Sequence, residues 1–147
     1  MKLSNYLLIC VIIVTQFSCK HKVESLTDAE RKIVFSATAH TPFRVLQITD
    51  KTDSLTLRTD CSDLTNFVGD SAFTLLVERL KTTLETEDGV GIAAPQIGIN
   101  KNLFLFIRLD LPDQPVVVAV NPKIINKPDS LVCFERDGCL SIPDFSG

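Results

Sequence analysis

The sequence predicts a single α+β domain that combines helices with an antiparallel sheet. Apolar residues recur at helical spacing between positions 70 and 86, and two apolar runs of strand length follow at 103–109 and 116–120. A turn at 111–115 with two prolines separates these runs. The chain has 147 residues, 45% hydrophobic and 22% charged, which is typical of one globular domain and excludes a disordered chain.

The first 18 residues have the pattern of an export signal. A lysine precedes an uncharged apolar run at 6–14 that is too short to span a membrane. Ser18 and Cys19 follow, and the arrangement resembles a bacterial lipoprotein signal whose cysteine is lipidated, although Gln16 replaces the usual aliphatic residue. The sequence therefore predicts an exported protein, anchored to the membrane of the cell envelope through Cys19. A secreted or periplasmic product and an uncleaved, buried N-terminal element are the alternatives.

We divide the chain into a signal peptide at 1–18, a tether with a short helix at 19–39 and a partial domain at 40–147. Thr27 and Glu30 have the spacing of a capping box, so a short helix is expected to begin there.

Two less regular segments precede the main helix. Residues 43–48 contain β-branched and aromatic side chains and predict a short strand, whereas 49–63 are dense in Thr, Asp and Ser and predict a loop.

The main helix is predicted after Asp70, which can cap an amphipathic helix that ends at 87–89. Its apolar residues fall at helical spacing: Phe73, Leu76, Val77, Leu80 and Leu84.

The second half of the chain predicts β structure. The apolar runs at 103–109 and 116–120 are expected to be strands of an antiparallel sheet. Shorter strands are expected at 123–126 and 130–135.

Charge and cysteine content exclude some classes of function. Fifteen basic against 18 acidic residues give a net charge of −3, which leaves no basic excess for binding nucleic acid. Removal of the signal and acylation of Cys19 would leave Cys61, Cys133 and Cys139, an odd number. No C-x-x-C pair indicates a zinc knuckle or a thioredoxin-like site.

Residues 89–96 form the first candidate motif. Its two glycines allow close approach of a ligand or a strand, its two alanines add little bulk, and Gln96 offers two N–H donors. A tight turn between a helix and a strand would explain the same residues without a ligand.

Residues 138–141 form the second motif, in which Cys139 follows a glycine. Such a cysteine is a buried thiol, a nucleophile or a metal ligand. The two histidines, His21 and His40, both lie far upstream.

Together the two motifs resemble the peptide deformylase family, which carries G-x-G-x-A-A-x-Q and, some 40 residues later, E-G-C-L-S. The first motif is complete at 89–96, and the second is present with Asp137 in place of Glu. The resemblance covers residues 40–147 approximately. It implies a deformylase-like fold and a metallohydrolase that removes the formyl group from N-formyl-methionine peptides.

The resemblance also implies roles for single residues. Cys139 would be a ligand of a divalent metal, often iron in this family, with zinc or nickel as alternatives. Gln96 and the backbone N–H of Leu140 would stabilise the oxyanion. The backbone of Gly89, Val90 and Gly91 would pair with the peptide, and Val90 would help line the pocket for the methionine side chain.

The family's third motif, H-E-x-x-H, is absent from this sequence. That motif supplies two metal ligands and a general acid/base, so we expect a C-terminally truncated, inactive form that does not hold the metal by itself. The alternative is an exported, lipid-anchored relative that binds peptides without catalysis. A thiol protein using Cys133 and Cys139 is a third, minor interpretation.

Overall fold

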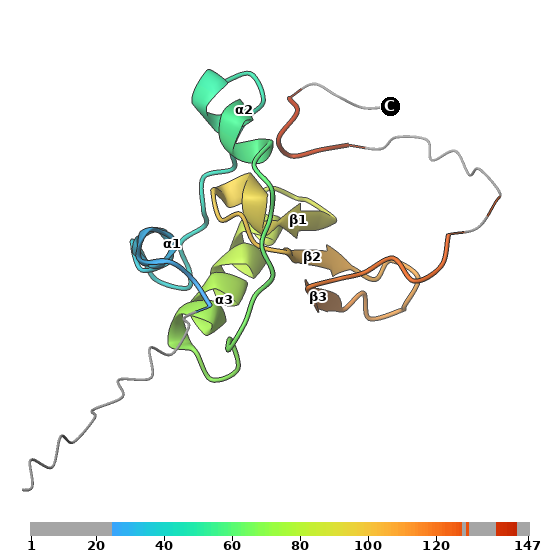
Figure 1. The fold of residues 1–147 in the computed structure, drawn as a ribbon. Coiled ribbons are helices and arrows are strands. Elements are labelled where there is room, and N and C mark those ends of the chain that lie inside the picture. The colour runs from blue at the N-terminus through green and yellow to red at the C-terminus, as the bar shows by residue number, and fades with distance from the viewer. Residues whose placement is uncertain (1–24, 128, 130–137, 144–147) are drawn as a thin grey trace, which may run out of the picture.

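The computed structural model describes residues 25–127, 129 and 138–143. In this part of the chain an antiparallel sheet packs against helix α3 (Figure 1). The elements are α1 (Asp28–Val34), α2 (Lys51–Leu57), α3 (Ser71–Thr86), β1 (Gly91–Ala93), the 3-10 helix η1 (Ala94–Ile97), β2 (Leu103–Ile107) and β3 (Val116–Val120). The α+β class is confirmed. No helix among the described residues has the length and apolar content needed to cross a membrane.

Helix α1 begins where the capping box predicts. The Thr27 hydroxyl accepts a hydrogen bond from the Glu30 N–H at 3.3 Å, and the Glu30 carboxylate accepts one from the Thr27 N–H at 2.7 Å. At the other end, the buried Arg79 of α3 donates to the Val34 carbonyl at 2.8 Å. The Arg79 guanidinium also lies 3.8 Å from the centre of the Phe43 ring. A cation at the C-terminal end of α1 satisfies carbonyls that the helix leaves without partners, so it fastens α1 to α3.

Helix α3 is the predicted amphipathic helix and forms one side of the core. Asp70 caps it by accepting a hydrogen bond from the Ala72 N–H at 2.9 Å, and the same carboxylate pairs with Arg31 of α1 at 2.7 Å. The helix ends at Thr86, with Glu87 as its C-cap. Three residues of its apolar stripe are fully buried, as the spacing predicts: Leu76, Leu80 and Leu84.

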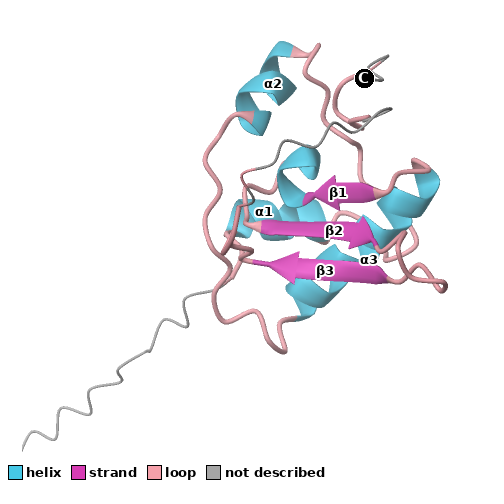
Figure 2. Cartoon of the chain, turned by 90° about the vertical axis from the view of Figure 1, so that its right-hand side faces the viewer, coloured by secondary structure: helices cyan, strands magenta, loops and turns pink. Residues whose placement is uncertain are grey.

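The sheet has the order β1-β2-β3 with antiparallel neighbours. Both predicted runs form strands, although β2 ends at Ile107 rather than at residue 109. Figure 2 shows the three strands in front of α3. Ile92 of β1 lies opposite Leu105 of β2, and both are buried in the core together with Leu103. Since side chains alternate along a strand, Phe104 projects from the other face of the sheet.

The strand predicted at 43–48 is wrong. These residues form no ladder, because their N–H groups donate to separate parts of the molecule. The Phe43 N–H donates to the Thr83 hydroxyl of α3 at 2.8 Å, and the Leu46 N–H donates to the Gln96 carbonyl of η1 at 2.7 Å. These two N–H groups therefore donate to residues of helices α3 and η1 and not to a neighbouring strand.

The loop predicted at 49–63 is wrong in its first half, which forms α2. Asp50 caps this helix by accepting hydrogen bonds from the N–H groups of Thr52 and Asp53, at 2.8 and 2.9 Å. The same polar composition that suggests a loop therefore supplies an N-cap.

The remaining predictions concern two short strands after β3 and the N-terminal export signal. The strand predicted at 123–126 is not formed. Ile124 and Ile125 are 89% and 97% exposed, so no neighbouring strand covers them among the described residues. The strand predicted at 130–135 and the export signal with Cys19 lie outside the described residues.

Candidate functional site

A cavity of about 450 Å³ lies where the two sequence motifs meet. Residues about 40 positions apart in the sequence share its walls, to which Asp88 and Gly138 also contribute. All six residues predicted to bind substrate, stabilise charge or hold a metal line this cavity: Gly89, Val90, Gly91, Gln96, Cys139 and Leu140. The structure therefore brings them together as the motifs suggest, while the role of each stays a prediction.

Helix η1 holds Gln96 at the cavity. The Gln96 Oε1 accepts a hydrogen bond from the Ala93 N–H at 2.8 Å, and its Nε2 lies 3.2 Å from the hydroxyl of the buried Ser141. Gly98 ends η1 with φ of +83°, a left-handed conformation that glycine adopts without strain. Because an amide nitrogen carries two protons, one N–H of Gln96 remains to donate to a ligand.

The loop that carries Cys139 is fixed from the segment around residue 47. The Leu140 carbonyl accepts a hydrogen bond from Gln47 Nε2 at 2.9 Å, and the Ser141 carbonyl accepts one from the Ile48 N–H at 3.0 Å. The N–H of Leu140 forms no hydrogen bond within the described part of the chain. The Cys139 thiol is exposed. This loop therefore presents an accessible sulfur beside an unused backbone donor.

Strand β1 supplies the third wall of the cavity. It pairs with β2 alone among the described strands, so its other edge has no strand partner. The Val90 carbonyl accepts a hydrogen bond from the Ile107 N–H at 2.9 Å, and Val90 itself is 60% exposed. At Gly91 a Cβ would lie in ordinary van der Waals contact with the carbonyl oxygen of Leu105, at 3.4 Å. An extended peptide can add to an edge of this kind through backbone hydrogen bonds.

The described residues do not make a metal site by themselves. None of them form a group of three or more His, Cys, Asp or Glu that could hold an ion. Among the residues that line the cavity, only Cys139 and Asp88 carry ligand-type side chains, and His40 is exposed and does not line it. A hydrolytic metal centre of the zinc type needs three protein ligands and an open position. The donor set present here therefore does not fit a catalytic metal.

Comparison with known proteins assigns the chain and its fold to one family. The sequence profile of the polypeptide deformylase family matches residues 43–147. The chain therefore belongs to the peptide deformylase family, as its two motifs suggest. Members of this family depend on a divalent metal, which the residues described here cannot hold alone.

Individual relatives agree with this assignment. The chain is 35% identical over 103 residues to a peptide deformylase of Prochlorococcus marinus strain NATL2A, covering 69% of this chain and 48% of that protein. It is 37% identical over 76 residues to a Synechocystis peptide deformylase, covering 51% of this chain and 40% of that protein. The chain thus spans less than half the length of these two relatives.

Solved structures of deformylases share the fold. The Thermotoga maritima peptide deformylase matches with a TM-score of 0.61 and 30% identity, over 72% of this chain and 65% of that one. A Met-Ala-Ser-bound peptide deformylase from Acinetobacter baumannii matches with a TM-score of 0.62 and 27% identity, over 74% of this chain and 69% of that one.

Sequence reasoning missed the residues that support the motif loops. Gln47 donates to the Leu140 carbonyl, and the Gln96 amide lies within hydrogen-bond distance of the Ser141 hydroxyl, yet neither Gln47 nor Ser141 is predicted from the sequence as a site residue. Ser141 was visible as the last residue of its motif. The only signal for Gln47 was a polar side chain within an otherwise apolar run at 45–48.

Proposed function

We propose that this chain carries the peptide-binding half of a deformylase site, which recognises peptides with an N-terminal N-formyl-methionine. The observation that carries the proposal is the cavity in which Gln96, Leu140 and β1 meet. One wall is a strand edge without a strand partner in the described chain, suited to an extended peptide. The other walls hold two N–H groups that the described residues leave available, suited to a carbonyl oxygen that gains negative charge.

The chemistry of deformylation gives these groups their roles. Water adds to the formyl carbon, the C–N bond then breaks, and formate leaves the freed amine of methionine. Negative charge develops on the formyl oxygen before the C–N bond breaks. Gln96 Nε2 and the Leu140 N–H would donate to that oxygen, and each such donor typically stabilises the transition state by about 2.7–4 kcal/mol. Val90, exposed beside the cavity, would contact the methionine side chain.

We further propose that the 147 residues alone bind such peptides but do not turn them over. The sequence contains no H-E-x-x-H, and the described residues hold no three-ligand set. A single thiolate does not fix a metal in a defined geometry. Binding without catalysis is therefore the second candidate function, favoured because the binding walls are present while the ligand set is incomplete.

The test measures binding and turnover separately. The purified, reduced chain is titrated calorimetrically with N-formyl-Met-Ala-Ser and with unformylated Met-Ala-Ser, the tripeptide bound in the Acinetobacter baumannii relative. Formate release is then measured with ferrous, nickel or zinc ions. We expect preferential binding of the formylated peptide and no formate above the metal-only background.

Two variants sharpen this test. Gln96→Leu removes the side-chain donor and should weaken binding of the formylated peptide, whereas Thr86→Val on the exposed side of α3 should not. Failure of the formylated peptide to bind would overturn the binding proposal. Metal-dependent formate release that disappears in Cys139→Ala would instead show that the chain completes its own catalytic site.

A further inference from the structure

Residues 46–48 connect both halves of the candidate site. The Leu46 N–H donates to the Gln96 carbonyl at 2.7 Å, on the side of the first motif. Gln47 Nε2 donates to the Leu140 carbonyl at 2.9 Å, and the Ile48 N–H donates to the Ser141 carbonyl at 3.0 Å, on the side of the second motif. Three consecutive residues therefore set the position of one motif relative to the other.

Among these three contacts, only that of Gln47 depends on its side chain. Leu46 and Ile48 donate from the backbone, so a substitution there leaves the hydrogen bond in place. The Leu140 carbonyl, in contrast, has Gln47 as its only hydrogen-bond partner in the described part of the chain. A substitution at residue 47 can thus release one peptide group of the site while the two backbone bonds remain.

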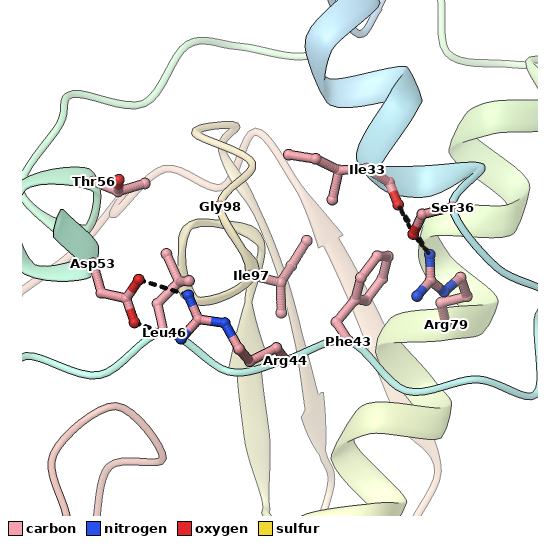
Figure 3. A pocket seen from close by; sticks show the side chains of 10 residues that line it. All are labelled: Ile33, Ser36, Phe43, Arg44, Leu46, Asp53, Thr56, Arg79, Ile97 and Gly98. Carbon is pink, nitrogen blue, oxygen red and sulfur yellow. Dashed lines mark hydrogen bonds and ion pairs between the residues drawn. The ribbon is translucent and has the colours of Figure 1, made fainter. Parts of the chain in front are cut away.

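The backbone of Gln47 is held in turn by a hydrogen bond to the side chain of Asp53. Its N–H donates to the carboxylate of Asp53 at 3.0 Å, and that carboxylate also accepts two hydrogen bonds from Arg44, both at 2.7 Å (Figure 3). Asp53 is only 4% exposed and lies in the first turn of α2. The bonds from Arg44, and then that from Gln47, hold the pKa of Asp53 below its ordinary value. The Asp53 carboxylate is therefore ionised at neutral pH and keeps residue 47 in place.

We propose that Gln47 is a positioning residue of this site: it holds the carbonyl of the Leu140–Ser141 peptide group and thereby positions the loop that presents the Cys139 thiol and the Leu140 N–H beside the cavity. Its importance for peptide recognition rests on the proposed function. The contact itself does not, so its effect on the loop is measurable without turnover. The Gln47 amide donates to the Leu140 carbonyl at 2.9 Å and, at 3.5 Å, to the Val45 carbonyl, which explains why a half-buried polar side chain stands in an otherwise apolar segment.

The experiment compares Gln47→Met, which has similar length and no donor, with Gln47→Lys, which restores an N–H donor. Amide hydrogen exchange of residues 139–142 and the alkylation rate of the Cys139 thiol are measured by mass spectrometry on the full, reduced chain. Cys61 is also exposed and serves as an internal control in each sample. Gln47→Asn, which keeps the amide but is one methylene shorter, provides a milder variant if Gln47→Met does not fold.

We expect Gln47→Met to speed exchange of the Ile142 N–H, which donates to the Cys139 carbonyl at 2.9 Å, at least tenfold and to change Cys139 alkylation at least threefold. Cys61 alkylation and exchange within α3 should stay within twofold of the parent, and Gln47→Lys should recover most of the difference. Unchanged exchange and alkylation at 139–142 would overturn the proposal. Equal acceleration at Cys61 and in α3 would also overturn it, since that pattern indicates a general loss of stability.

Peptide binding then separates this proposal from the proposed function. A parent chain that binds N-formyl-Met-Ala-Ser, with affinity at least fivefold weaker in Gln47→Met, supports both. A parent chain that binds no peptide overturns the proposed function, while the exchange data still decide whether Gln47 positions the loop. Equal peptide affinities in parent and Gln47→Met would exclude a positioning role in recognition.

Discussion

Replacing Thr83 by valine removes one buried hydroxyl from α3 without changing the shape of the side chain. Thr83 is fully buried, and its Oγ1 accepts the hydrogen bond of the Phe43 N–H at 2.8 Å while donating to the Arg79 carbonyl at 2.7 Å. This contact attaches the beginning of the 43–48 segment to the core. Valine fills the same space but offers no acceptor to the Phe43 N–H.

The loss of stability in Thr83→Val depends on which group loses its hydrogen-bond partner. The Arg79 carbonyl still accepts the helical N–H four residues later, so it does not become unsatisfied. The Phe43 N–H loses its hydrogen-bond partner. Water does not replace that partner, because Phe43 is only 6% exposed and the hydrogen bond is buried. A buried donor without a partner destabilises a protein by about 1–3 kcal/mol. For a urea dependence of about 1–3 kcal/mol per molar, the midpoint of unfolding should fall by roughly 0.3–3 M.

The assay is urea unfolding of the purified chain followed by circular dichroism. Thr86→Val is the matched control, because it makes the same substitution in the same helix at an exposed residue whose hydroxyl donates only to the Thr82 carbonyl, at 2.7 Å. A surface change of this kind is expected to alter stability by less than about 0.5 kcal/mol. If Thr83→Val and Thr86→Val unfolded at the same urea concentration, the Phe43 N–H would not depend on Thr83, and the reasoning would be refuted.

Two further predictions concern acid and the cavity. Arg44 holds the pKa of Asp53 below its ordinary value, so the stability that this pair contributes is present above about pH 4 and is lost as the pH falls through the folded-state pKa of Asp53. The stability difference between the parent and Arg44→Gln, measured by denaturation from pH 6 to pH 2, should therefore shrink toward pH 2, and a constant difference would contradict the role of the pair. Gly89→Ala would place a Cβ 3.1 Å from Leu84 Cδ1 and 3.1 Å from Leu140 Cδ1, so it should displace Leu140 and weaken binding of N-formyl-Met-Ala-Ser at least threefold in a calorimetric titration. Unchanged affinity would show that this wall does not shape the peptide site.

The sequence predicted those elements whose determinants lie within the element itself. The capping box at Thr27 and Glu30 needs only local atoms, and the structure forms it. The apolar stripe after Asp70 likewise encodes both the helix and its buried face. The two apolar runs predicted β2 and β3 because continuous apolar sequence of that length is typical of buried strands.

The failures have a different physical origin. Residues 43–48 carry strand-like side chains, but their N–H groups pair with Thr83, Gln96 and Ser141, which are distant in sequence. Local propensity does not report such partners. Within 49–63, the side chain of Asp50 decides between a loop and a helix, and the same residue type favours both turns and N-caps.

At the site, too, the motif residues could be predicted from the sequence, whereas the residues that contact them from distant positions in the sequence could not. Gln96 and Cys139 stand out because a family resemblance marks them, and the structure places both at one cavity. The residues that hold these two loops in register, Gln47 and Ser141, act through one or two hydrogen bonds each and leave no periodic pattern.

This arrangement has a consequence for the function of the chain. The groups proposed to recognise a formyl peptide are fixed by bonds between described residues: Gln96 by Ser141 and Ala93, and Leu140 by Gln47. Metal binding, in contrast, needs ligands beyond Cys139 that the described residues do not provide. Under the proposed function, the groups that would bind the formyl peptide and the ligands that a metal would need are therefore different residues, so we expect peptide binding by this chain to be measurable whether or not formate is released.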